Sequence, residues 1–278
     1  MIPVDLLVVG GLTLDQLASG RLAAGGAARY ATEAALADGR SVALLTAAGL
    51  EPEVRGWLAS LGEAVPTTVR AVPTSIRFEH TGSADDRRLR LLAAVSPLTA
   101  SDAPGLVRAR AVLFGPVAGD IAPALVAAAP SDSVRVAGIQ GWLRRSDADG
   151  WVDVHPLGEL PSDLATVMRS LDLLVASERD IGHELLAPQA LAILRAWSGP
   201  GPDLVITAGA AGAWAQSADG PLTHIQATRL ADTVPTVGAG DAFAAILAAH
   251  RGAGQSLAAA VAAANAATAR WLAIRPAP

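Results

Sequence analysis

The stretch Val4-Asp5-Leu6-Leu7-Val8-Val9-Gly10-Gly11 is a short apolar run that ends in two glycines. A run of this length without polar alternation is typical of a strand buried on both faces, as in a parallel sheet. Farther along, residues 27–36 have the composition of a helix, and Gly39 can end that helix with a C-terminal cap. This part of the sequence therefore predicts a buried strand followed by a helix.

The same alternation of strand and helix continues along the chain. Residues 41–47 predict a second buried strand and residues 52–61 a second helix. Later apolar runs predict strands at residues 111–114, 134–139, 171–176 and 204–207, and two Ala-rich helices are expected at residues 241–251 and 256–272. The intervals between these strands are long enough for crossover helices, which parallel strands require. We therefore predict an α/β fold, with a doubly wound, mostly parallel sheet flanked by helices.

Residues 67–95 have a different pattern, in which apolar and polar side chains alternate. Ile76 and Phe78 are separated by a polar residue, and a polar turn at residues 81–86 precedes a second alternating segment. A period of two is typical of half-exposed β-strands. We predict one domain over residues 1–278, with a small β-hairpin lid contributed by about residues 12–24 and 67–95.

The residue types that are absent exclude several kinds of chemistry. The sequence has no Cys and no Lys, which excludes disulfides, thiolate nucleophiles, Schiff bases and the Lys of a P-loop. The five His residues lack the spacing of a zinc hydrolase. Any phosphoryl transfer by this chain must therefore depend on backbone amides, Arg side chains and a metal ion.

Net charge and the length of apolar runs limit the kinds of partner that we expect for this protein. A formal charge of −5 argues against nucleic acid, because proteins that bind it normally present a basic face. Charged residues interrupt the apolar runs, so we expect no segment of the roughly 18–20 apolar residues that span a bilayer. The first residues lack the basic start of a signal peptide. We therefore expect a cytoplasmic protein with no membrane partner.

The strongest chemical signal is Val237-Gly238-Ala239-Gly240-Asp241-Ala242-Phe243, which leads directly into an expected helix. The N–H groups of a first helical turn have no partner within the helix, and small residues let an anion approach them closely. An Asp held in the same turn can take a proton from an attacking hydroxyl. The alternative is an ordinary glycine turn in which Asp241 only stabilises the helix N-terminus.

Gly238-Ala239-Gly240-Asp241 resembles the core of the C-terminal signature of the PfkB, or ribokinase-like, carbohydrate kinases. Other segments resemble motifs of this family in the same order across almost the whole chain. Residues 25–31 resemble the Gly-Gly segment beside the substrate, and residues 207–213 resemble the loop along ATP. The resemblance implies a ribokinase-like fold, ATP and Mg²⁺ as cofactors, a small polyol or sugar as partner, and phosphoryl transfer to a hydroxyl.

The resemblance also implies a role for each matching residue. Asp241 is the expected general base, and Gly238, Ala239 and Gly240 are expected to supply the amides of an anion hole. The expected substrate-binding residues are Asp15, Gly25, Gly26, Gln140 and Arg144. The expected nucleotide-binding residues are Ser177, Asp180, Thr207, Gly209, Gly212 and Asn265, and Asp180 is also expected to hold the metal ion through water.

Within the family, the details resemble plant-type myo-inositol kinases. Residues 138–144 resemble the Asp-Ile-Gln-Gly-x-x-Arg segment of that group, and Tyr30 stands where sugar kinases usually have Asn. These features favour a myo-inositol-like acceptor. Three positions depart from the pattern. Gly138 replaces the Asp of that segment, Pro235 replaces the first Asp of the signature, and Ser177-Glu178-Arg179-Asp180 stands in place of Asn-x-x-Glu.

Alternatives remain open for the protein and for single residues. The departures would also suit a catalytically weak relative that binds a polyol or a nucleotide for regulation. Gly10-Gly11 after the first strand suggests a dinucleotide-dependent oxidoreductase, although the sequence there lacks Gly-x-Gly-x-x-Gly. For Asp15 the alternative is a turn residue, and for Asn265 a helix-packing residue. The exposed lid strands would serve as a cover over the substrate or as the contact of a homodimer.

Overall fold

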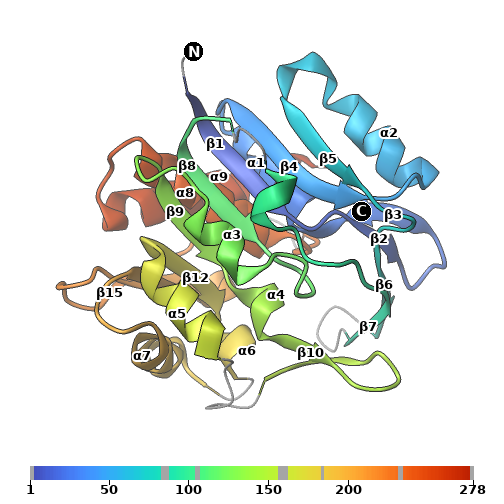
Figure 1. Ribbon diagram of the computed structural model, residues 1–278. Coiled ribbons are helices and arrows are strands. Elements are labelled where there is room, and N and C mark those ends of the chain that lie inside the picture. The colour runs from blue at the N-terminus through green and yellow to red at the C-terminus, as the bar shows by residue number, and fades with distance from the viewer. Residues whose placement is uncertain are drawn as a thin grey trace.

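A nine-stranded sheet forms the centre of the protein, with helices on both of its faces (Figure 1). The computed structural model describes residues 3–82, 88–103, 107–155, 162–182, 185–230 and 234–275. The strand order is β15 (Thr223–Ile225), β14 (Ala213–Gln216), β13 (Asp203–Thr207), β12 (Leu173–Ser177), β9 (Val134–Gly138), β8 (Ala109–Gly115), β1 (Val4–Gly10), β4 (Val42–Ala48) and β5 (Thr67–Ala71). The strands from β5 to β13 pair in parallel, and β14 and β15 add antiparallel pairs at one edge. The predicted α/β class with a mostly parallel sheet is confirmed.

Two layers of helices cover the sheet. The helices of the described residues are α1 (Gly26–Ala37), α2 (Pro52–Ser60), α3 (Pro123–Ala127), α4 (Gln140–Leu143), α5 (Ser162–Ser170), α6 (Glu178–Ile181), α7 (Ala187–Ser198), α8 (Ala239–Gly252) and α9 (Leu257–Ile274). In β1, Leu6 and Val8 belong to the core cluster that contains α1, α8 and α9, while Leu7 and Val9 belong to the cluster that contains α3, α5 and α7. The first apolar run is continuous because both faces of its strand are buried.

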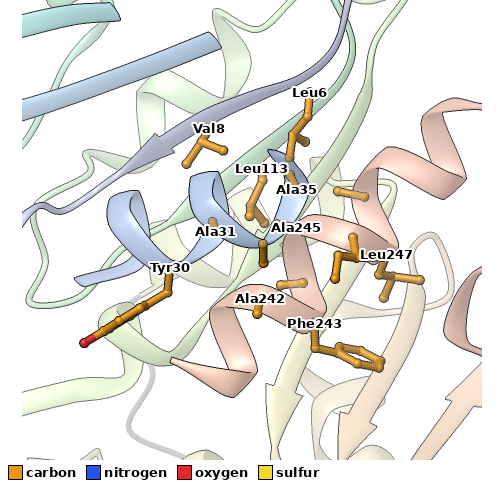
Figure 2. Close-up of a cluster of buried hydrophobic side chains, with 14 of the residues drawn as sticks. Leu6, Val8, Tyr30, Ala31, Ala35, Leu113, Ala242, Phe243, Ala245 and Leu247 are labelled. Carbon is orange, nitrogen blue, oxygen red and sulfur yellow. The ribbon is translucent and has the colours of Figure 1, made fainter. Parts of the chain in front are cut away.

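Helices α1 and α8 pack through small side chains. Ala31 and Ala35 of α1 lie between the two helices with Ala242 and Ala245 of α8, and all four residues are buried (Figure 2). Alanines at such a contact allow two helix backbones to approach closely. Helix α8 is therefore held firmly against α1, and its first turn is fixed relative to the sheet.

One predicted segment lies elsewhere than expected. Residues 67–71 were expected in the lid, but they form β5, which pairs in parallel with β4 at the edge of the main sheet. An edge strand is open to solvent on one side and shows the same alternation as an exposed hairpin strand. The assignment of these residues to the lid is therefore wrong. The other predicted strands and helices named above are found within a few residues of their expected bounds.

A second, four-stranded sheet lies apart from the main one, and we call it the lid sheet. Its order is β3 (Leu22–Gly25), β2 (Thr13–Gln16), β6 (Ile76–Thr81) and β7 (Arg88–Ala93). A short hairpin, β10 (Arg144–Ser146) and β11 (Val152–Val154), continues beside β7 through a bridge between Arg90 and Trp151. Most of the predicted polar turn, from residue 83 on, lies outside the described residues.

The connection into the lid sheet is anchored by a carboxylate. The Glu51 side chain accepts hydrogen bonds of 2.8 Å from both the backbone N–H and the hydroxyl of Ser75, directly before β6. Burial raises the pKa of Glu51, but the hydrogen bonds from Ser75 outweigh it and hold the pKa below its usual range. The ionised carboxylate therefore fixes the point where the lid sheet leaves the main body.

Helix α9 differs from one expectation. Among the described residues it is the single helix long and apolar enough to cross a membrane by length and composition. Nearly half of it is buried within the protein, where it packs against α8. A buried core helix satisfies the same criteria, so α9 is weak evidence for a membrane partner.

Candidate functional site

One cavity of about 820 Å³ brings together the lid sheet, the strand ends and helix α8. The last residues of four parallel strands line it, namely Gly115, Gly138, Ser177 and Thr207. The lid sheet contributes Thr13, Asp15, Phe78, His80 and Leu89. The carboxyl ends of parallel strands are the usual ligand-binding edge of an α/β sheet. Of the site residues predicted from the sequence, all except Gly25 line this one cavity.

Helix α8 presents its N-terminus to the cavity. Gly238 is its N-cap residue and has a φ of 77°, in the left-handed region that favours glycine. Among the described residues no side chain caps this first turn, and residues 236–241 all line the cavity. The expected helix start, with Asp241 in the first turn, is confirmed. The role of Asp241 as a base stays a prediction.

Tyr30 of α1 supports this turn from behind. A Cβ atom on Gly238 would lie 2.2 Å from Cγ of Tyr30, so the ring packs directly on the Gly238 backbone. Figure 2 shows the Tyr30 hydroxyl pointing away from the apolar cluster. Burial raises the pKa of Tyr30 to about 12, with further contributions from the carboxylates of Asp15 and Asp241. The hydroxyl therefore stays protonated near neutral pH and can donate a hydrogen bond.

Asp15 is the buried carboxylate of the lid sheet, and both of its oxygens have neighbours. Oδ1 accepts a hydrogen bond of 2.8 Å from the Thr13 hydroxyl, and Oδ2 lies 3.4 Å from Nε2 of His80. Gly25 lies beside it, where an added Cβ would be 2.2 Å from Oδ2 of Asp15. Gly25 therefore leaves room for the carboxylate and does not face the cavity. The turn-residue alternative for Asp15 does not fit, because Asp15 lies within strand β2.

The loop after β13 forms another part of the cavity wall. Gly209 and Gly212 have φ values of 53° and 97°, and a Cβ on Gly212 would lie 2.3 Å from the carbonyl oxygen of Ile225. Asn265 of α9 donates a hydrogen bond of 3.0 Å to the carbonyl oxygen of Gln226. Asn265 therefore joins α9 to the loop that follows β15, and it also lines the cavity.

Ser177 and Asp180 are tied to each other at the start of α6. The Asp180 N–H donates to Oγ of Ser177 at 3.2 Å, and the Ser177 N–H donates to Oδ2 of Asp180 at 2.8 Å. This reciprocal capping box satisfies two backbone donors. In the part of the chain that the structure describes, no three carboxylate, His or Cys side chains form a group that could hold a metal ion. A magnesium ion here would therefore need most of its oxygen ligands from a bound substrate and water.

Gln140 and Arg144 also line the cavity, at the start and just after the end of the short helix α4 that follows β9. Nη1 of Arg144 donates a hydrogen bond of 3.0 Å to the carbonyl oxygen of Val117, and its guanidinium lies 5.9 Å from the centre of the Phe78 ring. Asp120 holds the Val117 turn, because its Oδ1 accepts hydrogen bonds from the N–H groups of Val117 and Ala118.

Asp120 makes the stability of this wall depend on pH. Its Oδ2 is buried without a hydrogen-bond partner, and burial raises the pKa of the carboxyl despite the bonds from Ala118 and Val117. A raised folded-state pKa stabilises the fold fully below the unfolded pKa of about 3.9, and this contribution is lost as the pH rises through the folded value. We expect the wild type to lose stability relative to Asp120→Asn as the pH rises above about 3.9, as measured by urea unfolding.

The control variant for this experiment is Asp120→Ala. It removes the acceptor of two buried amides and should cost about 1–3 kcal/mol at every pH. Parallel stability curves for the wild type and Asp120→Asn across this pH range would contradict a buried carboxyl with a raised pKa.

Sequence reasoning missed His80 and Phe78 as cavity residues. Both lie on β6 with Ile76, and the side chains of alternate residues in a strand share a face. Extending the alternation of Ile76 and Phe78 by two residues would have found His80. Its contact with Asp15 depends on the pairing of β2 with β6, which brings together residues far apart in the sequence.

Comparison with known families agrees with the motif analysis. A model of the pfkB family carbohydrate kinases matches residues 140–271, which include α4, the loop after β13 and the start of α8. The fold also matches a solved pyrophosphate-dependent kinase in the ribokinase family, complexed with a pyrophosphate analog and myo-inositol. The fold of the chain is therefore ribokinase-like, and its residues 140–271 are similar to the pfkB carbohydrate kinases. The comparison with curated proteins found no match.

The ribokinase-like fold extends over essentially the whole chain. The pyrophosphate-dependent kinase has a TM-score of 0.79 at 19% identity, and the alignment covers 98% of this chain and 96% of that one. Ribokinase from Cryptococcus neoformans var. grubii in complex with ADP has a TM-score of 0.72 at 18% identity, with 100% and 96% covered. Aminoimidazole riboside kinase from Salmonella enterica, complexed with its riboside and an ATP analog, has a TM-score of 0.72 at 20% identity, with 96% and 93% covered.

Proposed function

We propose that this chain is an ATP-dependent kinase that transfers the γ-phosphoryl group to a hydroxyl of a small sugar or cyclitol, with myo-inositol-like acceptors favoured. The observation that carries the proposal is the arrangement around one cavity of Asp15, Asp241 and the uncapped start of α8. A carboxylate that can bind hydroxyls, a carboxylate that can act as a base and an anion-binding helix terminus are the groups this reaction needs.

The proposed mechanism assigns Asp241 to the proton and the start of α8 to the phosphoryl group. The acceptor hydroxyl attacks the γ-phosphorus while its proton passes to the Asp241 carboxylate. The bond from the γ-phosphorus to the leaving oxygen of ADP breaks, and the amides of Gly238, Ala239 and Gly240 stabilise the charge on the transferred group. A Cβ on Gly240 would meet no atom within 4 Å, so the approach to these amides is open.

The acceptor is proposed to lie between the lid sheet and α4. Asp15 accepts hydrogen bonds from acceptor hydroxyls, and the protonated hydroxyl of Tyr30 is a donor at the same end of the cavity. Gly26, Gln140 and Arg144 also line the cavity, and Arg144 lies near Phe78 of the lid sheet. This set contains both donors and acceptors, which suits a molecule with several hydroxyl groups.

The donor is proposed to lie along Thr207, Gly209 and Gly212, with Asn265 on the side of the base. Mg²⁺ would be bound mainly by the donor phosphates, and Ser177 and Asp180 would contact its water ligands. The ion would neutralise part of the charge of the phosphates. We also propose a cytoplasmic location and a homodimer formed through the lid sheet.

Pyrophosphate is the second candidate for the donor. Three similar solved structures are pyrophosphate-dependent kinases of the ribokinase family or of myo-inositol. Arg179 and Arg229 both line the cavity. Arg binds phosphate oxygens through paired hydrogen bonds, so two arginines would suit a compact, highly charged donor. With pyrophosphate as the donor, the proposed acceptor and the proposed role of Asp241 as the base stay the same.

A matrix of donors and acceptors tests the proposal. Purified protein with Mg²⁺ is given ATP or pyrophosphate together with cyclitols, pentoses, hexoses or nucleosides, and phosphorylated product is detected by mass spectrometry. Product formed with ATP is the expected result, and product formed only with pyrophosphate would replace the donor. Calorimetric binding of a polyol without product from any pair would favour the catalytically weak binding relative.

Gly25→Ala tests the proposed role of Asp15 in binding the acceptor. The new methyl group would lie within 2.2 Å of Oδ2 of Asp15 and 2.8 Å of the Thr13 hydroxyl, so the carboxylate must move. The backbone of Gly25 is extended, with φ −153°, so no backbone strain is added. We expect the acceptor KM to rise by about tenfold or more, with a smaller change in kcat, in steady-state kinetics.

Gly56→Ala is the matched control for this prediction. Gly56 lies in α2, and a Cβ there would meet no atom within 4 Å. This variant should keep the KM of the wild type and gain up to about 1 kcal/mol in stability. An unchanged acceptor KM in Gly25→Ala would show that Asp15 does not bind the acceptor.

A further inference from the structure

Arg275, the residue after α9, places a guanidinium group against the loop that precedes α8. Its Nη2 donates a hydrogen bond of 2.7 Å to the carbonyl oxygen of Pro235. The guanidinium carbon lies 4.3 Å from the centre of the Trp271 ring and 5.8 Å from the centre of the Tyr30 ring. The contact therefore joins the end of α9 to α1 and to the loop at residues 234–238.

The partly buried surroundings of Arg275 disfavour its positive charge, but the side chain stays charged. Its Nε is buried without a partner, and burial lowers the pKa of the side chain, although an Arg in a protein stays protonated. Within the described ranges no carboxylate lies at ion-pair distance from Arg275, and Arg29, the other guanidinium at the Tyr30 ring, is paired with Glu33 at 2.8 Å. The positive charge of Arg275 is therefore not neutralised by a direct partner.

Two of the groups that Arg275 contacts, the Pro235 carbonyl and the Tyr30 ring, adjoin Gly238. Pro235 directly precedes the turn at residues 236–239, in which the Ala239 N–H donates to the carbonyl oxygen of Thr236 at 3.0 Å. The Tyr30 ring packs directly on the Gly238 backbone. A shift of Arg275 would therefore move the start of α8 through the Pro235 carbonyl and through the ring at the same time. Arg275 does not line the cavity, so any effect on the reaction must pass through these neighbours.

We propose that Arg275 is a positioning residue for phosphoryl transfer: it fixes the amides at the start of α8, and its charge adds to the positive potential of that helix terminus. This inference rests on the proposed function, because it assumes that the start of α8 binds the transferred group. The competing explanation is that Arg275 only packs the end of α9 against Trp271.

Arg275→Ala and Arg275→Lys, with Arg270→Ala as control, separate the two explanations. Arg270 lies on α9, is mostly exposed and contacts Asp38, so its loss removes an equal charge away from the cavity. We expect kcat of Arg275→Ala to fall by about 10- to 100-fold with little change in the acceptor KM, because a small displacement at the reacting centre has effects of this size. Arg275→Lys and the addition of millimolar guanidinium chloride to Arg275→Ala should each restore part of kcat, and Arg270→Ala should behave as the wild type.

The outcomes distinguish this inference from the proposed function. A wild type that transfers phosphate, with kcat unchanged in Arg275→Ala, would overturn the inference alone. The inference would also be overturned if the loss of kcat in Arg275→Ala matched the fraction of unfolded protein and neither Arg275→Lys nor added guanidinium restored kcat. For a wild type without turnover, calorimetry replaces kinetics. Weaker binding of a non-hydrolysable ATP analogue or of pyrophosphate by Arg275→Ala than by Arg270→Ala would support the inference, and equal or absent binding would overturn it.

Discussion

Asp241→Asn is expected to lower kcat by about 10²–10⁴-fold, because Asn keeps the shape of Asp but cannot accept a proton from the attacking hydroxyl. Asp241 lies in the first turn of α8 and lines the cavity, so the substitution changes the proposed base and leaves the helix in place. Steady-state kinetics with the best donor and acceptor gives kcat. Calorimetry with the nucleotide should give a dissociation constant close to that of the wild type.

The matched control is Asp203→Asn, which makes the same change at a residue that contacts the last turn of α8. Asp203 begins β13, and its Oδ2 lies 2.9 Å from Nη2 of Arg251 in the last turn of the helix. This variant should lose at most about 1 kcal/mol of stability and keep kcat. Near-normal turnover of Asp241→Asn would exclude Asp241 as the base.

Gly238→Ala is expected to have the second large effect, on both stability and activity. An added Cβ would lie 2.2 Å from Cγ of Tyr30, and φ of 77° is unfavourable for alanine. Strain in the left-handed region and overpacking against a buried ring together should lower the free energy of unfolding by about 2–5 kcal/mol. The start of α8 must shift to relieve the contact, so we expect kcat to fall in the folded protein as well. Urea unfolding and kinetics at a temperature where the variant is folded measure the two effects.

Gly39→Ala separates the effect of backbone strain from the effect of the contact with Tyr30. Gly39 has a φ of 76°, nearly that of Gly238, but an added Cβ there would meet no atom within 4 Å. This control should lose about 1–2 kcal/mol from the backbone alone and keep kcat. If the two variants lost equal stability and both kept kcat, the contact of Tyr30 with Gly238 would have no part in positioning the site.

The local features of the fold could be predicted from the sequence. Residues 6–9 are continuously apolar because β1 is buried on both faces, and this pattern alone indicates a parallel sheet. The start of α8 was equally accessible, because glycines and an Asp before an Ala-rich segment describe an open helix terminus without reference to any distant residue. These signals depend on neighbours in the sequence, which is why they could be interpreted without the structure.

The features that depend on distant residues could not be predicted in this way. Residues 67–71 alternate as a hairpin strand would, and only the parallel pairing with β4 shows that they form the edge of the main sheet. The contact of His80 with Asp15 requires the pairing of β2 with β6. Arg275 was not singled out, because its contacts with Pro235 and Tyr30 span 40 or more positions of the sequence.

The undivided cavity has a consequence for inhibitor design. The proposed acceptor end, at Asp15, and the proposed donor end, at Asn265, belong to one continuous space of about 820 Å³. A single compound that links a cyclitol to adenosine through a short phosphate chain could occupy both ends at once. Such a bisubstrate ligand gains from the high effective concentration of its second half, and its potency as a function of linker length would report the separation of the two ends in solution.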